Sequence, residues 1–141
     1  MTMNLSPYVR FQDNAREALT FYKSILGGTL TLSTFGEYDD SLDEATGSLI
    51  MHGELETDAD FIILASDTPA PMPFDPGARI SLAIFGDNEF KMAEYYNALL
   101  SQGGSTQMPL EKAPWGDSFG MVTDHYGVNW MFNISGANHG D

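Results

Sequence analysis

Cysteine is absent from the sequence of 141 residues, and its absence removes several classes of chemistry. Without a thiol the chain cannot form a disulfide, a thiolate nucleophile, or a zinc or iron–sulfur centre ligated by cysteine. No apolar run approaches the ~20 residues that a membrane-spanning helix needs. Residues 1–14 have neither a basic segment nor a long apolar run, so no signal peptide is expected. We therefore predict a cytoplasmic protein.

Positive charge is also scarce, with 6 Lys and Arg against 20 Asp and Glu and a net charge of -14. Binding to phosphate backbones and to anionic lipids depends on clustered cations, so neither a nucleic-acid partner nor a membrane partner is expected. Such acidity is typical of a well-solvated surface. It is also compatible with a cationic small molecule.

The C-terminal part of the chain has the pattern of a β-hairpin. Two β-like runs, 119–123 and 128–132, flank the loop 124–127, which ends in Gly. Alternation puts Phe119 on one face of the first strand and Trp130 on one face of the second. We interpret these faces as one shared wall, which either belongs to the core or lines a pocket.

The first half of the chain predicts a strand, a helix and three strands. A strand over 5–11 precedes apolar residues with helical spacing from Ala15 to Leu26, and Gly27-Gly28 ends that helix. Asn14 and Glu17 fit a capping box at its start. β-like runs then follow near 29–35, 48–55 and 60–65, and an acidic loop over 37–47 separates the first two.

The second half repeats this order after a linker over 66–78, which contains four prolines and cannot continue a helix or a central strand. A strand over 79–85 precedes Asp87-Asn88, which is predicted to cap a helix that Gly103-Gly104 ends. Strands near 105–110, 119–123 and 128–134 complete the second half, and 135–141 is predicted to be a flexible tail.

The two halves are similar in sequence as well as in order. Phe11-Gln12-Asp13-Asn14 returns as Phe85-Gly86-Asp87-Asn88, and Gly27-Gly28-Thr29 as Gly103-Gly104-Ser105. We predict an α+β fold in which one domain, 1–141, consists of two βαβββ units, 5–65 and 79–134, with paired curved mixed sheets and flanking helices. A concave site between such sheets is the expected place for a ligand.

Several longer motifs are distributed over residues 5–134, and these are LSPYVRF (5–11), ALTFYKSILGG (18–28), TFGE (34–37), IMHGEL (50–55), ASD (65–67) and WGDSFGMVTDHYGVNW (115–130). In these motifs the sequence resembles the vicinal oxygen chelate superfamily of glyoxalases, bleomycin-resistance proteins and dioxygenases, and within it the PhnB-like, or 3-demethylubiquinone 3-methyltransferase-like, branch.

The resemblance also implies where a metal would be bound. Metal enzymes of the superfamily carry His or Glu on the first and last strands of each unit, and these positions fall on Ser6 and Ser81 and near Ile63 and Met131. None of these side chains is a suitable ligand for a divalent catalytic metal. We therefore expect no metal and no cofactor.

Polar candidates for a binding site lie in the predicted strands and loops. Alternation puts Tyr8 and Arg10 on the face that the resemblance directs into the cavity, where a scarce cation would anchor an anionic group. His52 is either a structural residue of its strand or a proton-transfer group in the cavity. Asp117 is either a ligand-binding carboxylate or part of a turn. His125 and His139 are expected at the surface.

Aromatic candidates complete the set of predicted ligand-binding residues. A planar or amphipathic molecule would stack on side chains that otherwise belong to the core, and these are Tyr8, Phe35, Trp115, Phe119 and Trp130. We predict a metal-free, homodimeric small-molecule-binding protein, with no catalytic residue assigned. The alternatives are a metal-dependent lyase or dioxygenase of the glyoxalase type with displaced ligands such as His52, a methyltransferase-like enzyme, or an interaction module without a small ligand.

Overall fold

The computed structural model describes residues 5–69, 80–101, 103–114 and 116–136. The chain divides into two compact units, Met1–Pro76 and Gly77–Asp141, and each is described here by itself. Residues 70–78 of the predicted linker and 137–141 of the predicted tail lie outside the described residues. Among the described helices none is long and apolar enough to cross a membrane.

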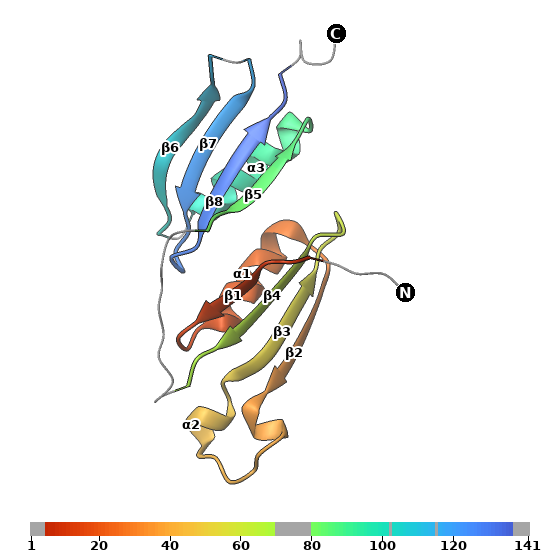
Figure 1. Cartoon of the computed structure of the whole chain (residues 1–141), viewed down its shortest axis with the longest axis vertical. Coiled ribbons are helices and arrows are strands. Elements are labelled where there is room, and N and C mark those ends of the chain that lie inside the picture. Colours follow the sequence, from red (N-terminus) through yellow and green to blue (C-terminus); the bar gives the residue numbers. More distant parts are fainter. Residues whose placement is uncertain (1–4, 70–79, 102, 115, 137–141) are drawn as a thin grey trace. The chain divides into compact units, whose positions relative to one another are not determined.

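The first unit is a four-stranded mixed sheet with a helix on one face (Figure 1). Its strand order is β1-β4-β3-β2, in which β1 is parallel to β4 and the other neighbours are antiparallel. Its elements, in chain order, are β1 (Tyr8–Phe11), α1 (Ala15–Leu26), β2 (Thr29–Thr34), the 3-10 helix η1 (Phe35–Glu37), α2 (Glu44–Gly47), β3 (Ile50–Glu56) and β4 (Ile62–Asp67).

The second unit repeats this topology, with strand order β5-β8-β7-β6 and β5 parallel to β8. Its elements are β5 (Leu82–Gly86), α3 (Glu89–Leu100), β6 (Ser105–Lys112), β7 (Ser118–Thr123) and β8 (Asn129–Ile134). The predicted fold of two βαβββ units with mixed sheets and helices is thus confirmed. The short helix α2, inside the predicted acidic loop, was not foreseen.

The helix ends follow local chemistry, with one exception. Gly27, at a φ of 73°, ends α1, and the Asn88 side chain accepts a hydrogen bond from the Lys91 N–H at the start of α3, both as predicted. The capping box predicted for α1 is wrong, because the Asn14 side chain makes no capping hydrogen bond. The Ala15 N–H donates instead to Asp67 Oδ1, 2.8 Å away at the end of β4.

Each sheet has one face covered by its own helix and one face that this helix leaves uncovered, called the open face here. A Cβ atom added to Gly53 would lie 2.5 Å from Leu19 Cδ1 of α1, and one added to Gly120 would lie 3.0 Å from Tyr96 Cε2 of α3. The strand faces that carry Gly53 and Gly120 are therefore the helix-covered faces. Strand alternation places the residues on either side of them on the open faces.

The hydrophobic core of each unit lies between the helix and the covered face. In the second unit the rings of Tyr96 and Phe132 meet edge to face at 5.6 Å between centroids, and the Tyr96 hydroxyl donates to the Met108 carbonyl. The fully buried side chains of the molecule include Tyr22, Leu19, Ile50 and Leu55 in the first unit and Phe132 and Val122 in the second.

The sequence repeat does not keep its register in the first strands. Phe11 is 3% exposed and pairs with Asp67, whereas Phe85 is 79% exposed and pairs with Asn133 on the open face. The equivalent of Phe11 at the end of β5 is Gly86, which pairs with the last residue of β8, Ile134. Aligning the two phenylalanines is therefore wrong by one residue in the strand, and a one-residue slip reverses the face.

Candidate functional site

The open face of the first sheet brings together three of the predicted site residues. Tyr8 pairs with Leu64 and Arg10 with Ser66 across the β1–β4 ladder. His52 lies next to Gly53 of the covered face and so points to the open face, where it pairs with Ser33. Tyr8, Arg10 and His52 thus lie on one face, the face that α1 does not cover.

The rings of Tyr8 and His52 are close enough to form one aromatic surface. Their centroids are 6.2 Å apart, with an angle of 41° between the ring planes. Tyr8 is exposed and His52 half-buried, so both rings present area to solvent. A tilted pair of rings at this distance provides an apolar surface, to which the Tyr8 hydroxyl and the His52 ring nitrogens add polar groups.

Arg10 and His52 also belong to a line of polar residues that crosses the sheet. Arg10 pairs with Ser66, and His52 pairs with Ser33. The β3–β4 ladder ends with Gly53 opposite Ala65, and His52 and Ser66 are the next residues of these two strands, both on the open face. We call Arg10, Ser66, His52 and Ser33 the polar row.

The guanidinium of Arg10 is not neutralised by a carboxylate of the described chain. Over residues 5–69, 80–101, 103–114 and 116–136 the one ion pair within 4.0 Å is Lys91–Glu94, both on α3. Glu54 is on the same open face, in the neighbouring line that contains Leu64. Arg10 is therefore available to an anionic group brought in by a ligand.

Phe35 lies outside the strands of the sheet, in η1. It begins η1 directly after β2, is half-buried, and its N–H donates to the Leu49 carbonyl at 3.1 Å. The backbone N–H and hydroxyl of Thr34 donate to Glu37 Oε2 and hold this turn in place. The predicted aromatic residue is thus part of the connection that leads from the sheet to α2.

Phe119 and Trp130 lie on opposite faces of the second sheet, so the predicted shared wall is wrong. The β7–β8 ladder pairs Val122 with Trp130 and Phe119 with Asn133, which separates the two aromatic residues by one step of alternation. Trp130 is 2% exposed on the face covered by α3, and its Nε1 donates to Asp124 Oδ2 at 2.9 Å. Phe119 is half-buried on the open face.

Asp117 has a structural environment in the second unit. Its carboxylate accepts hydrogen bonds from Asn133 Nδ2 at 2.9 Å and from the Gly136 N–H at 3.1 Å. Its backbone carbonyl accepts from the Ala113 N–H at 2.7 Å. With 6% of its surface exposed, Asp117 joins the loop before β7 to the end of β8.

Three further residues were named from the sequence, Trp115, His125 and His139. Trp115 and His139 lie outside the described residues. His125 is exposed in the β7–β8 loop, where its ring lies 5.0 Å from that of Tyr126.

The donor set does not suit the divalent metal that the fold family implies. Ser6 and Ser81 precede β1 and β5, Ile63 lies on the covered face beside open-face Leu64, and Met131 lies on the open face between Met121 and Ala83. In the described part of the chain no three His, Cys, Asp or Glu side chains gather into a metal-binding group. Divalent catalytic metals need such ligands, so the residues present do not fit one.

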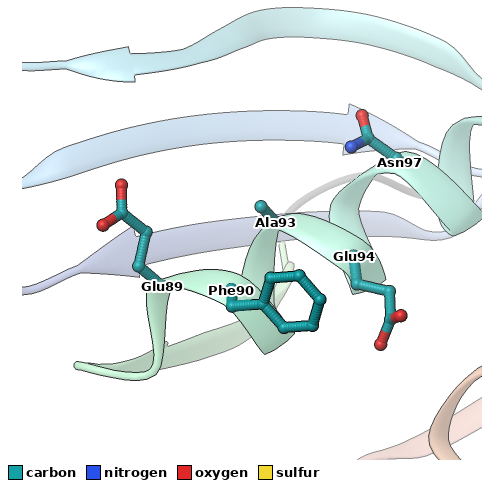
Figure 2. A pocket seen from close by; sticks show the side chains of 5 residues that line it. All are labelled: Glu89, Phe90, Ala93, Glu94 and Asn97. Carbon is teal, nitrogen blue, oxygen red and sulfur yellow. The ribbon is translucent and has the colours of Figure 1, made fainter.

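A depression on the second unit is separate from all of these residues. Its lining comes entirely from the exposed side of α3, as Figure 2 shows, and consists of Glu89, Phe90, Ala93, Glu94 and Asn97. None of the predicted site residues lines it.

Sequence reasoning missed Ser66 and Ser33, which complete the polar row. Both are small polar residues in strands, and only the pairing of β1 with β4 and of β2 with β3 brings them beside Arg10 and His52. Alternation gives the face of a residue but not its neighbour on the next strand, so the sequence carried no direct signal for this row.

The chain matches known proteins over nearly its whole length. The profile of the Glyoxalase/Bleomycin resistance protein/Dioxygenase superfamily matches residues 4–132. Protein YjdN of Escherichia coli (strain K12) is 24% identical over 143 residues, covering 94% of this chain and 95% of its own.

Among solved structures, protein PA1353 from Pseudomonas aeruginosa is 36% identical with a TM-score of 0.82, covering 96% of this chain and 99% of its own. A putative 3-demethylubiquinone-9 3-methyltransferase, PhnB protein, from Bacillus cereus shares the fold, with a TM-score of 0.71 and 22% identity over 94% of this chain and 100% of its own.

Proposed function

The chain belongs to the glyoxalase/bleomycin resistance protein/dioxygenase superfamily, and from that premise we propose that it is a small-molecule-binding protein of the PhnB-like group. It binds an amphipathic or aromatic molecule on the open face of the first sheet, without a catalytic metal. The resemblance in sequence to the PhnB-like branch, over residues 5–134, supports the assignment to that group.

The observation that carries this proposal is the Tyr8–His52 ring pair. Aromatic side chains are usually buried in the core, where they contribute most to stability. Here two rings lie 6.2 Å apart on the face that α1 does not cover, and Tyr8 is 49% exposed. Exposed aromatic area beside polar groups is typical of a surface that receives an amphipathic partner.

Binding without turnover accounts for the chemistry of the surroundings. The open face carries one imidazole and one guanidinium together with hydroxyls, and in the described part of the chain no hydrogen bond joins the His52 imidazole to the Ser66 or Ser33 hydroxyl, as a nucleophile activated by a general base would need. Sequestration of a ligand needs only shape and polarity. Proteins of this fold serve several chemistries, so function has to be tested at the site itself.

The proposal is tested by amide NMR spectra of the whole chain during titration with a panel of aromatic and amphipathic compounds. We expect shifts confined to β1, β3 and β4 for at least one compound, and loss of that binding in Tyr8→Ala and His52→Ala. Tyr38→Ala and His125→Ala are matched controls, because both replace exposed aromatic residues elsewhere. No saturable shift with any compound would overturn the proposal.

Metal analysis separates binding from the competing enzyme hypothesis. Protein purified without chelator is expected to contain no stoichiometric zinc, nickel, iron or manganese. A stoichiometric metal that is lost in His52→Ala and kept in His125→Ala would replace the binding proposal by a metal enzyme with displaced ligands.

A further inference from the structure

We propose that the polar row binds a carboxylate group of the ligand, centred over Ser66 with the Arg10 guanidinium on one side and the His52 imidazole on the other. This inference rests on the proposed function and names the chemical class of the molecule, an amphipathic or aromatic carboxylate. It is carried by the register of β1, β4 and β3 and by the unpaired charge of Arg10.

The strand order and register place Arg10 and His52 at a distance that suits a small anionic group bound between them. Neighbouring strands lie about 4.8 Å apart, so Arg10 on β1 and His52 on β3 are separated by roughly 10 Å between Cα atoms, with Ser66 of β4 between them. A long Arg side chain and an imidazole can both reach a small group above the middle strand. The Ser66 hydroxyl is a further hydrogen-bond donor at that point.

The Arg10 side chain is exposed and forms no ion pair with a carboxylate of the described chain. The sequence has 6 Lys and Arg in 141 residues, and within the described residues the ion pair of the molecule is Lys91–Glu94. An arginine presents several N–H donors in a fixed planar fork, which matches the two oxygens of a carboxylate. An uncompensated guanidinium beside a buried serine is therefore a suitable anion anchor.

The surrounding charges favour a monoanion over a dianion. Glu54 and Glu56 lie on the same open face, where they pair with Leu64 and Ile62, and the net charge of the chain is -14. A phosphoryl dianion is repelled about twice as strongly by these carboxylates as a carboxylate is. The spacing of the polar row and the negative charge around it therefore both favour a carboxylate as the bound group.

His52 adds a further hydrogen-bonding group to this site. The groups on the open face around the imidazole are Tyr8 and Arg10 from β1, Ser66 from β4, Ser33 from β2 and Glu54 on its own strand. An imidazole N–H can donate a hydrogen bond to a carboxylate oxygen, so His52 is expected to contribute to carboxylate affinity.

The test measures the binding of three compounds with the same naphthalene ring to the full-length chain. Naphthoate carries a carboxylate, naphthamide is its neutral analogue, and naphthyl phosphate carries a dianion. Affinities are measured by calorimetry and located by amide NMR. We expect naphthoate to bind about tenfold or more tightly than naphthamide, since a hydrogen-bonded charge is worth that much. Arg10→Gln is expected to abolish this difference.

Matched variants keep the result interpretable. Arg16→Gln removes the same charge from the exposed side of α1 and is expected to leave naphthoate affinity unchanged. If Arg10→Gln does not fold, Arg10→Lys keeps the charge without the planar fork and is expected to weaken naphthoate by several-fold. His52→Gln, which removes the imidazole, is expected to lower naphthoate affinity.

The outcomes distinguish the two proposals. Equal affinities for naphthoate and naphthamide, with shifts on the open face, would overturn the carboxylate site and leave the proposed function standing. Tighter binding of naphthyl phosphate than of naphthoate would overturn the choice of a monoanion. Absence of shifts with every probe, and with the wider panel above, would overturn the proposed function as well.

Discussion

The carboxylate of Asp67 accepts a hydrogen bond from the backbone N–H of Ala15, 2.8 Å away and 52 residues earlier in the chain. Its second oxygen accepts from the Ile50 N–H, also at 2.8 Å. Asp67 is 4% exposed at the end of β4. One buried side chain therefore holds the first residue of α1 and the first residue of β3 against the central strand.

Asp67→Ala is expected to destabilise the protein by about 3 kcal/mol, because two buried backbone donors lose a charged acceptor. Asp67→Asn keeps one acceptor oxygen and should cost less. Chemical denaturation measures both values. Asp40→Ala, at an exposed position in the loop before α2, is the control and should change stability by less than about 0.5 kcal/mol. A cost for Asp67→Ala as small as that of the control would contradict the anchoring role.

Trp130 is expected to matter for stability and not for ligand binding. Trp130→Phe removes the Nε1 donor to Asp124 Oδ2 and should cost about 1–3 kcal/mol, since a buried acceptor then loses this donor. Ligand affinity on the open face of the first sheet should be unchanged, as measured by the NMR titration. A loss of affinity without a loss of stability would restore Trp130 to the binding site.

Local pattern predicted α1, α3 and the strands of both sheets, because each of these elements has its own signal, but it did not predict α2. The apolar spacing of Ala18, Leu19 and Tyr22 and the glycine at position 27 define α1, and the structure places α1 over those same residues. The hairpin of β7 and β8 follows in the same way from its alternation and its Gly-ended loop.

The pairing of strands, and contacts between residues that are far apart in the sequence, could not be predicted from local pattern. The cap of α1 comes from Asp67 and not from Asn14, because a residue far along the chain competes for the same N–H. Alternation alone predicts one shared wall for Phe119 and Trp130, but the pairing of β7 with β8 places them on opposite faces. The candidate site was predicted through Tyr8, Arg10 and His52, but their spacing depends on registers that alternation leaves open.

Two glycines with positive φ are expected to differ in their tolerance of a side chain. Gly28, at 106°, would place a Cβ atom 2.6 Å from Thr57 Cα, against backbone that cannot move aside, whereas Gly127, at 85°, has open space. Gly127→Ala should cost about 1 kcal/mol for the backbone conformation alone. Gly28→Ala should cost about 3 kcal/mol or more, because overlap adds to that strain. Equal melting temperatures for the two variants would contradict this difference.

Acid is expected to loosen α2 before the rest of the fold. The Thr46 side chain and N–H hydrogen-bond to Asp43 and hold the pKa of that carboxyl below its usual range. Because the pKa is lower in the folded state, the cap contributes stability above the unfolded pKa and loses it as pH falls from about 4 through the folded value. The protection factors of the Thr46 and Gly47 amides against hydrogen exchange should fall over that range in wild type and be low throughout in Asp43→Ala. Global melting should change little, since Asp43 is exposed.

The one-residue slip between the units makes Phe11 and Phe85 a test of the register. Phe11 is 3% exposed on the covered face and Phe85 79% exposed on the open face, although both stand in the same sequence motif. Phe11→Ala should destabilise the protein by about 3–5 kcal/mol through lost burial and a cavity. Phe85→Ala should cost less than about 1 kcal/mol, because its ring is in water before and after unfolding. Similar losses of stability for the two variants in denaturant titrations would contradict this difference in burial. They would mean that Phe85 lies on the covered face, as the shared motif aligns it with Phe11, and that the open face of the second sheet is wrongly assigned.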